Sequence, residues 1–219
     1  MNILENLHSL IPNYETTLPF SKEKVSFTPF RVKDAKALSV ILQEDNKKLA
    51  LKNMIDLLKT YASGTNIDDL CLADAEYLFL QIRSKSVDEI LNLIYNNEKI
   101  QVNIAEIKPR NEVTEEHINL SGMILVLQTP TVKDLLRVPS FDKEEVAKAC
   151  IQKIIVGNEI YKVNKFVTEE IKQLIENLPL SIVGKLDSFL KRQPELYFNL
   201  SVMEGTKEVS GLLNFFTYR

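Results

Sequence analysis

The sequence predicts an α+β fold, in which amphipathic helices pack against small antiparallel sheet elements. Apolar residues recur with the period of a helix over residues 32–97 and 131–194, whereas over 98–130 and 195–219 they alternate with the period of a strand. The chain has 219 residues, 45% hydrophobic and 26% charged, a composition that can bury a core without disulfides or metal ions. No internal repeat, low-complexity tract or flexible linker divides the chain, so we expect a single domain over residues 1–219.

The first part of that domain, residues 18–97, is expected to be an extended arm followed by helices. Residues 18–30, LPFSKEKVSFTPF, alternate apolar and polar side chains between two prolines, which favours an arm or short strands. Two amphipathic helices follow, and Gly64 is placed to end the second of them. The residues that mark these helices are Ala35, Leu38, Ile41 and Leu42 for the first and Ala50, Met54, Leu57, Leu58 and Tyr61 for the second.

Two further helical segments are expected between residues 74 and 95. Asp74 is placed to cap the segment AEYLFLQIR, whose apolar side chains nearly surround the helix axis and therefore predict deep burial. Ser86 and Glu89 have the spacing of a capping box ahead of ILNLIY. The pattern leaves open whether the two segments form one bent helix or two.

Residues 98–130 predict a central β-hairpin, or two strands of a small sheet. Ile100, Val102 and Ile104 alternate in KIQVNIAEI, and HINLSGMILVLQTP gives a stronger strand pattern around Gly122. The polar segment KPRNEVTEE between them predicts the connecting loop.

Residues 131–194 return to helical periodicity, and residues 195–219 predict a C-terminal β-hairpin. Asp142, Thr168 and Ser181 are placed to begin helices, and GN at 157–158 predicts a turn. ELYFNLSV and KEVSGLLNFF then alternate on either side of Gly205. The hairpin is expected to carry apolar side chains on both faces, because the chain ends with Leu212, Leu213, Phe215 and Phe216. One face would pack on the core, and the other would need a further cover from this chain or from a partner.

Composition and charge exclude several classes of partner. The 27 basic and 30 acidic residues are interspersed and give a net charge of −3, so no basic footprint for a nucleic acid is present. No apolar run reaches the roughly 18 residues of a membrane span, and the first residues lack the pattern of a signal peptide. Cys71 and Cys150 are 79 positions apart and are expected to be buried free thiols in a reducing cytoplasm.

The residues also predict no catalytic, cofactor or metal site. His8 and His117 lie in no metal-ligand spacing, and the six glycines form no phosphate-binding loop. The adjacent carboxylates, such as Asp68 and Asp69, are expected to be solvated, because neighbours on a helix point about 100° apart. We therefore expect a protein without a cofactor and not an enzyme.

The basic pair in IRSKS permits two interpretations. Arg83 and Lys85 follow a very apolar helix, where cations interact favourably with the helix C-terminus. They are also placed for a charged contact with a partner beside a buried element. Both interpretations stay open at this point.

Four stretches, in order over residues 18–216, carry a family resemblance. They are LPFSKEKVSFTPFRVKDAKAL, DAEYLFLQIRSKSVDEI, CIQKIIVGNEIYKVNKFVTEEIKQLIENLP and the ending GLLNFF. Together they resemble the baseplate hub and hub-assembly family of T-even-type bacteriophages, and the second stretch is the most specific. The chain departs from the family pattern at Asp88, where a glycine is expected.

The resemblance implies assembly of a particle rather than chemistry. Members of that family are needed to build the central hub of the contractile-tail baseplate inside the infected cell, some as hub subunits and others as assembly factors. The matched positions have no catalytic role in the family. They are Arg83, Lys85, Ser86, Gly211, Leu212, Phe215 and Phe216.

The leading hypothesis is a hub-assembly chaperone that acts by non-covalent binding in the cytoplasm of the infected host. Its expected partners are other phage baseplate hub or tape-measure proteins, and a homo-oligomer stays open. The alternatives are a structural hub subunit retained in the virion baseplate and, from another class, a cytoplasmic adaptor. The candidate partner-binding residues are Arg83, Lys85, Leu212, Leu213, Phe215 and Phe216.

Overall fold

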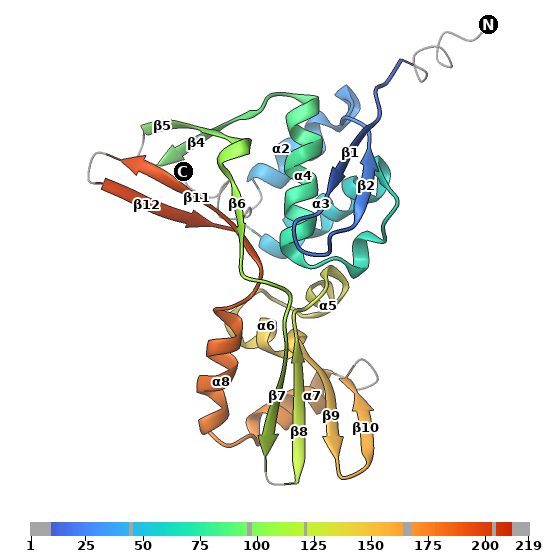
Figure 1. Ribbon diagram of the computed structural model, residues 1–219, viewed down its shortest axis with the longest axis vertical. Coiled ribbons are helices and arrows are strands. Elements are labelled where there is room, and N and C mark those ends of the chain that lie inside the picture. Colours follow the sequence, from blue (N-terminus) through green and yellow to red (C-terminus); the bar gives the residue numbers. More distant parts are fainter. Residues whose placement is uncertain are drawn as a thin grey trace, which may run out of the picture. The chain divides into compact units, whose positions relative to one another are not determined.

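The computed structural model describes residues 10–43, 46–95, 98–120, 122–163, 168–202 and 205–211 (Figure 1). The chain forms two compact units: unit 1 comprises Met1–Arg110 and Glu195–Arg219, and unit 2 comprises Asn111–Pro194. Helices and small antiparallel sheets make up both units, so the predicted α+β class is confirmed. The single domain over residues 1–219 stays a prediction, because it depends on how the two units associate.

The N-terminal arm of unit 1 forms a small antiparallel sheet. Strands β1 (Tyr14–Thr17) and β2 (Lys24–Phe27) pair along their whole length, and β2 also pairs with the two-residue β3 (Ala62–Ser63). Of the two predictions for this stretch, the short strands are confirmed. The side chains of Val25 and Phe27 on β2 are buried.

The two helices predicted after the arm are present. A short 3₁₀ helix, η1 (Val32–Asp34), leads into α2 (Ala35–Gln43), and α3 (Lys47–Tyr61) follows after Asn46, whose side chain caps it by accepting from the N–H groups of Lys48 and Leu49. The predicted stop at Gly64 is wrong. Helix α3 ends at Tyr61, because the chain there becomes extended to pair as β3, and Gly64 instead forms the turn after β3 at φ +93°.

Helix α4 (Leu72–Ser86) follows the 3₁₀ helix η2 (Ile67–Asp69) and is buried on most sides. The deep burial predicted for AEYLFLQIR is confirmed: Leu78, Phe79 and Ile82 are fully buried. Two predictions about its ends are wrong. Cys71 occupies the N-cap position, and Asp74 lies within the first turn with its carboxylate turned to another segment. Ser86 ends α4 and begins no helix, because the chain that follows it pairs as a strand.

The remaining strands of unit 1 form two more antiparallel sheets. Strands β4 (Ile90–Tyr95) and β5 (Glu98–Asn103) form a hairpin, and the 3₁₀ helix η3 (Ile104–Glu106) follows it. The C-terminal hairpin is confirmed as β11 (Glu195–Val202) paired with β12 (Gly205–Ser210). The short strand β6 (Lys108–Arg110) pairs with β11 on its other side, which gives the order β12-β11-β6.

The predicted central hairpin over residues 98–130 is therefore wrong in its pairing. Its first strand, β5, pairs with the segment expected to be helical, and the segment KPR expected in a loop is β6. The stronger strand pattern around Gly122 is a hairpin by itself, β7 (Glu115–Leu120) with β8 (Met123–Gln128). The alternation of apolar and polar residues predicts a strand but not the strand with which it pairs, so the sequence did not distinguish the predicted pairing from the observed one.

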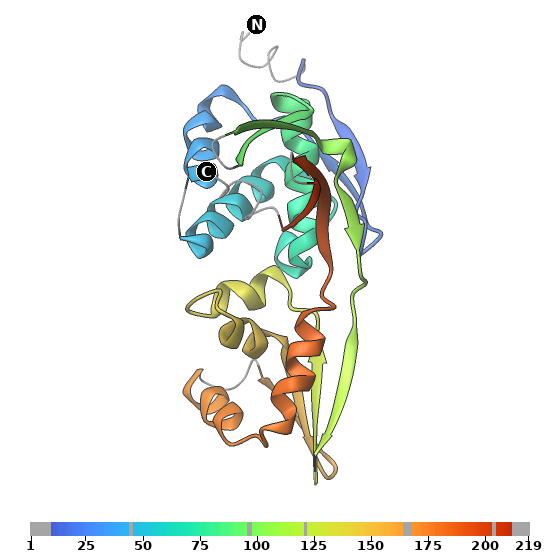
Figure 2. The same cartoon turned by 90° about the vertical axis from the view of Figure 1, so that its left-hand side faces the viewer.

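Unit 2 has one four-stranded antiparallel sheet in the order β10-β9-β8-β7, with β9 (Ile151–Val156) and β10 (Glu159–Lys162). Helix α5 (Val132–Arg137) follows β8, and α6 (Lys143–Cys150), α7 (Thr168–Glu176) and α8 (Ser181–Leu190) lie on one face of the sheet (Figures 1 and 2). The predicted helix starts at Asp142, Thr168 and Ser181 are confirmed within one residue. The prediction of helices over residues 131–194 is wrong for 151–162, because α6 ends at Cys150 and the chain that follows pairs as β9 and β10.

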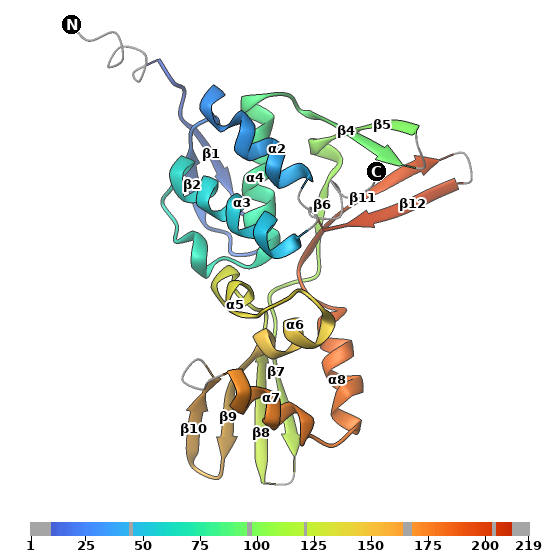
Figure 3. The ribbon, with the colours of Figure 1, turned by 180° about the vertical axis from the view of Figure 1, so that it is seen from behind.

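The core of unit 2 lies between this sheet and its helices. Ile118, Leu125 and Ile154 face each other across β7, β8 and β9 and are packed against helical side chains from α6, α7 and α8, namely Cys150, Ile171, Leu174, Ile175, Ile182, Leu186 and Phe189. Figure 3 shows α6 and α7 in front of the strands from that side. The predicted turn at 157–158 joins β9 to β10 with two residues, and Gly157 supplies the positive φ of +58° that its first position needs.

Candidate interaction surfaces

Arg83 and Lys85 lie in the last turn of α4 and make local contacts. The Arg83 guanidinium donates through Nη1 to the backbone carbonyls of Asp88 at 3.0 Å and Ile90 at 3.4 Å, so it closes the turn from α4 into β4. Burial lowers the pKa of Arg83, and the nearby Asp88 opposes that shift. The side chain therefore has a structural task within unit 1.

The side chain of Lys85 is more exposed than that of Arg83. Its ammonium forms an ion pair with Glu89 at 2.9 Å, and the two side chains are 37% and 60% exposed. An exposed pair of this kind contributes little to stability. Lys85 is therefore the member of the basic pair that is placed for a partner contact, and this contact stays a prediction.

The first two stretches of the family resemblance meet along α4. Near its N-terminus, the Asp74 carboxylate accepts hydrogen bonds from the backbone N–H groups of Phe20 at 3.0 Å and Ser21 at 2.8 Å. At its C-terminus, the Ser86 hydroxyl accepts from the Phe30 N–H at 2.8 Å and donates to the Ile82 carbonyl. These hydrogen bonds attach the arm to both ends of α4.

Aromatic packing supports the same junction. The Phe30 ring contacts Phe79 of α4 at a centroid distance of 5.5 Å and meets Tyr61 of α3 edge-on at 5.3 Å. The LP…PF arm and the RSKS end of α4 are therefore explained by the folding of unit 1, and Ser86 has no free hydroxyl to offer a partner.

The described part of the C-terminal hairpin is apolar on one face and polar on the other. Leu196, Phe198 and Leu200 of β11 are buried, together with Val209 of β12 opposite Phe198. The hairpin ends with the Gly211 N–H bonded to the Leu196 carbonyl at 2.9 Å. Leu212, Leu213, Phe215 and Phe216 lie outside the described residues, and their partner-binding role stays a prediction.

Arg110 joins the three strands on the polar face of that sheet. Its Nε donates to Glu195 and its Nη1 to Glu208, each at 2.6 Å, and its guanidinium lies 5.0 Å from the centroid of the Tyr197 ring. The hydrogen bond that Arg110 donates to Glu195 raises the pKa of Arg110; burial opposes this rise, and the bond to Glu208 adds to it. Lys108–Arg110, which were expected in the connecting loop, are therefore part of a sheet.

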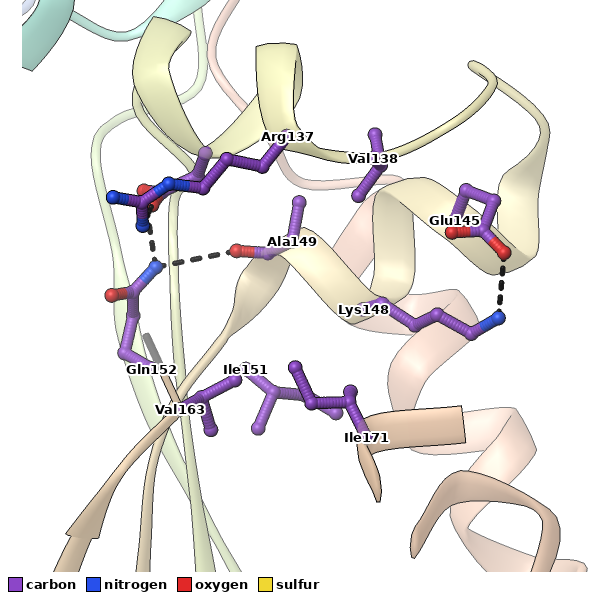
Figure 4. A pocket seen from close by; sticks show the side chains of 10 residues that line it. Arg137, Val138, Glu145, Lys148, Ala149, Ile151, Gln152, Val163 and Ile171 are labelled. Atoms are coloured by element: carbon purple, nitrogen blue, oxygen red, sulfur yellow. Dashed lines mark hydrogen bonds and ion pairs between the residues drawn. The ribbon is translucent and has the colours of Figure 1, made fainter. Parts of the chain in front are cut away.

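Unit 2 contains a pocket of about 230 Å³ lined by residues of α5, α6, α7 and β9 (Figure 4). Its charged lining residues are already engaged. Lys148, which is 6% exposed, forms ion pairs with Glu145 at 2.6 Å and Glu144 at 2.9 Å. Burial by itself would lower the pKa of Lys148, but its bonds to Glu144 and Glu145 outweigh burial and raise it.

The other carboxylate of the pocket, Asp134, serves the start of α5. It accepts from the Thr131 N–H at 3.1 Å and hydroxyl at 2.8 Å, and the Gln152 amide donates to it at 3.2 Å. These contacts fix the junction of α5, α6 and β9. The pocket thus presents compensated structural charges rather than a general acid and base.

The thiols are equally unsuited to chemistry. Burial raises the pKa of both Cys71 and Cys150 to about 12, so each is protonated at neutral pH. In the part of the chain that the structure describes, no three His, Cys, Asp or Glu residues are grouped to hold a metal ion. None of the described helices is both long and apolar enough to cross a membrane.

The open face of the unit 2 sheet is a surface that the sequence patterns did not single out. On the side away from α6–α8, Ile124, Ile155 and Ile160 lie in one row across β8, β9 and β10. Ile160 is 63% exposed, and every residue of the edge strand β10 is exposed. The sequence offered one signal for this surface, the alternating pattern of β9 (IQKIIV) and β10 (EIYK). That pattern separates the two faces of each strand but does not tell which face the helices cover.

Comparison with known proteins gives one family. A family model described as T4 bacteriophage base plate protein matches residues 11–217. No curated protein and no solved structure matches the chain.

Proposed function

Because the chain belongs to the T4 bacteriophage base plate protein family, we propose that it helps to build the central hub of the baseplate as an assembly chaperone that binds other phage proteins. In this proposal it acts in the cytoplasm of the infected cell, catalyses no reaction and needs no cofactor. Its partners are hub or tape-measure proteins.

The observation that carries the proposal is the one-sided sheet of unit 2. Its helices cover one face, while the other presents an apolar row that ends on the exposed edge strand β10. Exposed edge strands pair readily with other chains unless charge, proline or a cover prevents it. Such a surface suits transient non-covalent assembly, whereas Lys148 and Asp134 in the pocket of unit 2 make structural contacts.

The experiment is to remove and then recover the protein during infection. A phage with a stop codon early in this gene is expected to accumulate baseplate intermediates without a central hub, and the tagged chain supplied in trans is expected to restore them. Mass spectrometry of the material bound to the tagged chain should identify baseplate hub or tape-measure proteins. Complete baseplates without the protein, and no baseplate component on the tag, would contradict the proposal.

Purified virions separate the chaperone from the alternative of a structural hub subunit. The chaperone is expected in infected-cell extracts and absent from finished particles, whereas a hub subunit is retained at a fixed number of copies. Deletion of residues 212–219 in the same assay tests the predicted role of Leu212, Leu213, Phe215 and Phe216. Full complementation by the shortened chain would remove those four residues from the binding surface.

A further inference from the structure

We propose that β10 receives, by strand addition, an extended segment of a partner protein that carries an acidic side chain two positions from an apolar one. The inference rests on the proposed function, because it gives the chemistry of a segment that the chain would bind during assembly. Three observations on the open face of the unit 2 sheet lead to it: an exposed edge, two lysines that lie opposite each other and an apolar row beside them.

The edge is available for pairing. Strand β10 is the last strand in the order β10-β9-β8-β7, and no strand of the described residues pairs with its outer side. In a hairpin with a two-residue loop, the residues that flank the loop face the neighbouring strand with their backbone groups, and the next residue faces away. Glu159 flanks the loop, so the N–H and C=O groups of Ile160 and Lys162 are directed to the open edge.

The lysines supply the charge that an acidic side chain would meet. Lys162 lies directly opposite Lys153 of β9, and like charges in that position destabilise a sheet. Neither lysine forms an ion pair within the described ranges of the chain. Glu115, a carboxylate on the same face, lies on β7, three strands from Lys162 and two strands from Lys153. By strand spacing these separations are about 14 Å and about 10 Å, and Glu115 contacts His117.

The apolar row fixes the spacing of the partner residues. Ile160 and Lys162 are two positions apart and so point to the same face of β10. A strand added beside them would place its own side chains in the same rows, with one residue beside Ile160 and the other beside Lys162. In an extended segment with an apolar residue at position i and an acidic residue at i+2, the apolar side chain would pack beside Ile160 while the carboxylate would lie beside Lys162.

A second copy of this chain fits the edge less well. The Glu159 carboxylate of another β10 would lie on the helix-covered face, where it hydrogen-bonds to the Tyr161 hydroxyl, and it could not meet Lys162. The other edge strand, β7, presents Glu115, His117 and Asn119 on the open face and offers no apolar residue for Ile160. A nucleic acid would meet two lysines beside a row of isoleucines, which offers too little positive charge for phosphate binding.

The experiment is selection from a displayed library of random 12-residue peptides on the full chain. Enriched peptides are expected to share Asp or Glu two positions from Ile, Val, Phe or Tyr. Lys162→Glu is expected to weaken binding of a selected peptide at least tenfold. The same change places a carboxylate opposite Lys153, so it should keep or raise Tm by about 1–3 °C, which excludes misfolding as the cause. Lys185→Glu on the exposed side of α8 is the matched control and should leave binding unchanged.

Ile160→Pro tests the backbone contribution. Proline is tolerated where an edge-strand N–H faces solvent, so the variant should fold and lose peptide binding. Peptides without acidic residues, or binding unaffected by both Lys162→Glu and Ile160→Pro, would overturn the inference. Two other results would also overturn it. One is self-association of the chain, measured by sedimentation velocity, that Ile160→Pro abolishes. The other is binding of a single-stranded oligonucleotide, in place of a peptide, that depends on the lysines. If Ile160→Pro still recovers hub proteins from infected cells, strand addition fails while the proposed function stands.

Discussion

The carboxylate of Asp74 accepts a hydrogen bond from the backbone N–H of Ser21 at 2.8 Å, across 53 positions of the sequence. A second bond from the Phe20 N–H makes this fully buried aspartate the anchor of the N-terminal arm on helix α4. The residue expected to cap its own helix instead fixes a turn of a distant segment.

Replacing Asp74 by alanine is expected to destabilise unit 1 by about 2–3 kcal/mol, because two partly buried N–H groups would lose their acceptor. Denaturant unfolding followed by circular dichroism measures the change. Asp56→Ala, on the exposed side of α3, is the control and should stay within about 0.5 kcal/mol of the parent. Equal unfolding midpoints for the two variants would refute the anchoring role.

Ser86→Ala is expected to cost about 1 kcal/mol, because the Phe30 N–H would lose the hydroxyl that accepts its bond. Ser84→Ala is a matched control two residues away, since that hydroxyl donates only to the Gln81 carbonyl of its own helix. The two free energies of unfolding should differ by most of that amount. If they are the same, the bond that the Phe30 N–H donates to Ser86 contributes nothing measurable.

The basic pair at the end of α4 should separate into two roles. Arg83→Ala is expected to destabilise the protein by about 1.5–2 kcal/mol, because its bonds to the Asp88 and Ile90 carbonyls are lost. Lys85→Ala should change stability by less than about 0.5 kcal/mol, because its ion pair is exposed. Complementation of the stop-codon phage by the Lys85→Glu chain then tests the partner contact. Normal baseplate yield from that stable variant would remove Lys85 from the binding surface.

The buried thiols make stability fall at high pH. Both cysteines have a pKa of about 12 in the folded chain, compared with 9.0 for an unperturbed thiol, so the unfolded chain loses these protons first. Stability is therefore retained below pH 9 and decreases between pH 9 and 12, by up to about 1.4 kcal/mol per pH unit for each thiol. Thermal melts of the Cys71→Ala and Cys150→Ala variants should show a shallower decrease than the parent. In addition, a thiol reagent at pH 8 should label the unfolded chain and leave the native chain unlabelled.

The sequence by itself determined the elements whose hydrogen bonds and packing are local. The apolar period of α3, α7 and α8, the capping aspartate before α6 and the turn residues around 157–158 and 205 each act within a few positions of the chain. The same local patterns, taken together, gave the α+β class and the resemblance to a baseplate family, which the family match confirms.

Only the tertiary structure decided which of these elements meet. The pairing of β6 with β11 joins segments more than 80 positions apart. The Asp74 carboxylate bonds to the backbone of the arm, and no local pattern specifies where the arm lies. The exposed face of β10 was decided in the same way, because a strand's alternation gives its two faces and only packing selects the one that helices cover. Hydrogen bonding within one turn or one hairpin depends on neighbouring residues and can therefore be predicted from the sequence. Long-range pairing depends on loop closure and on the fit of surfaces that exist only once the chain has folded.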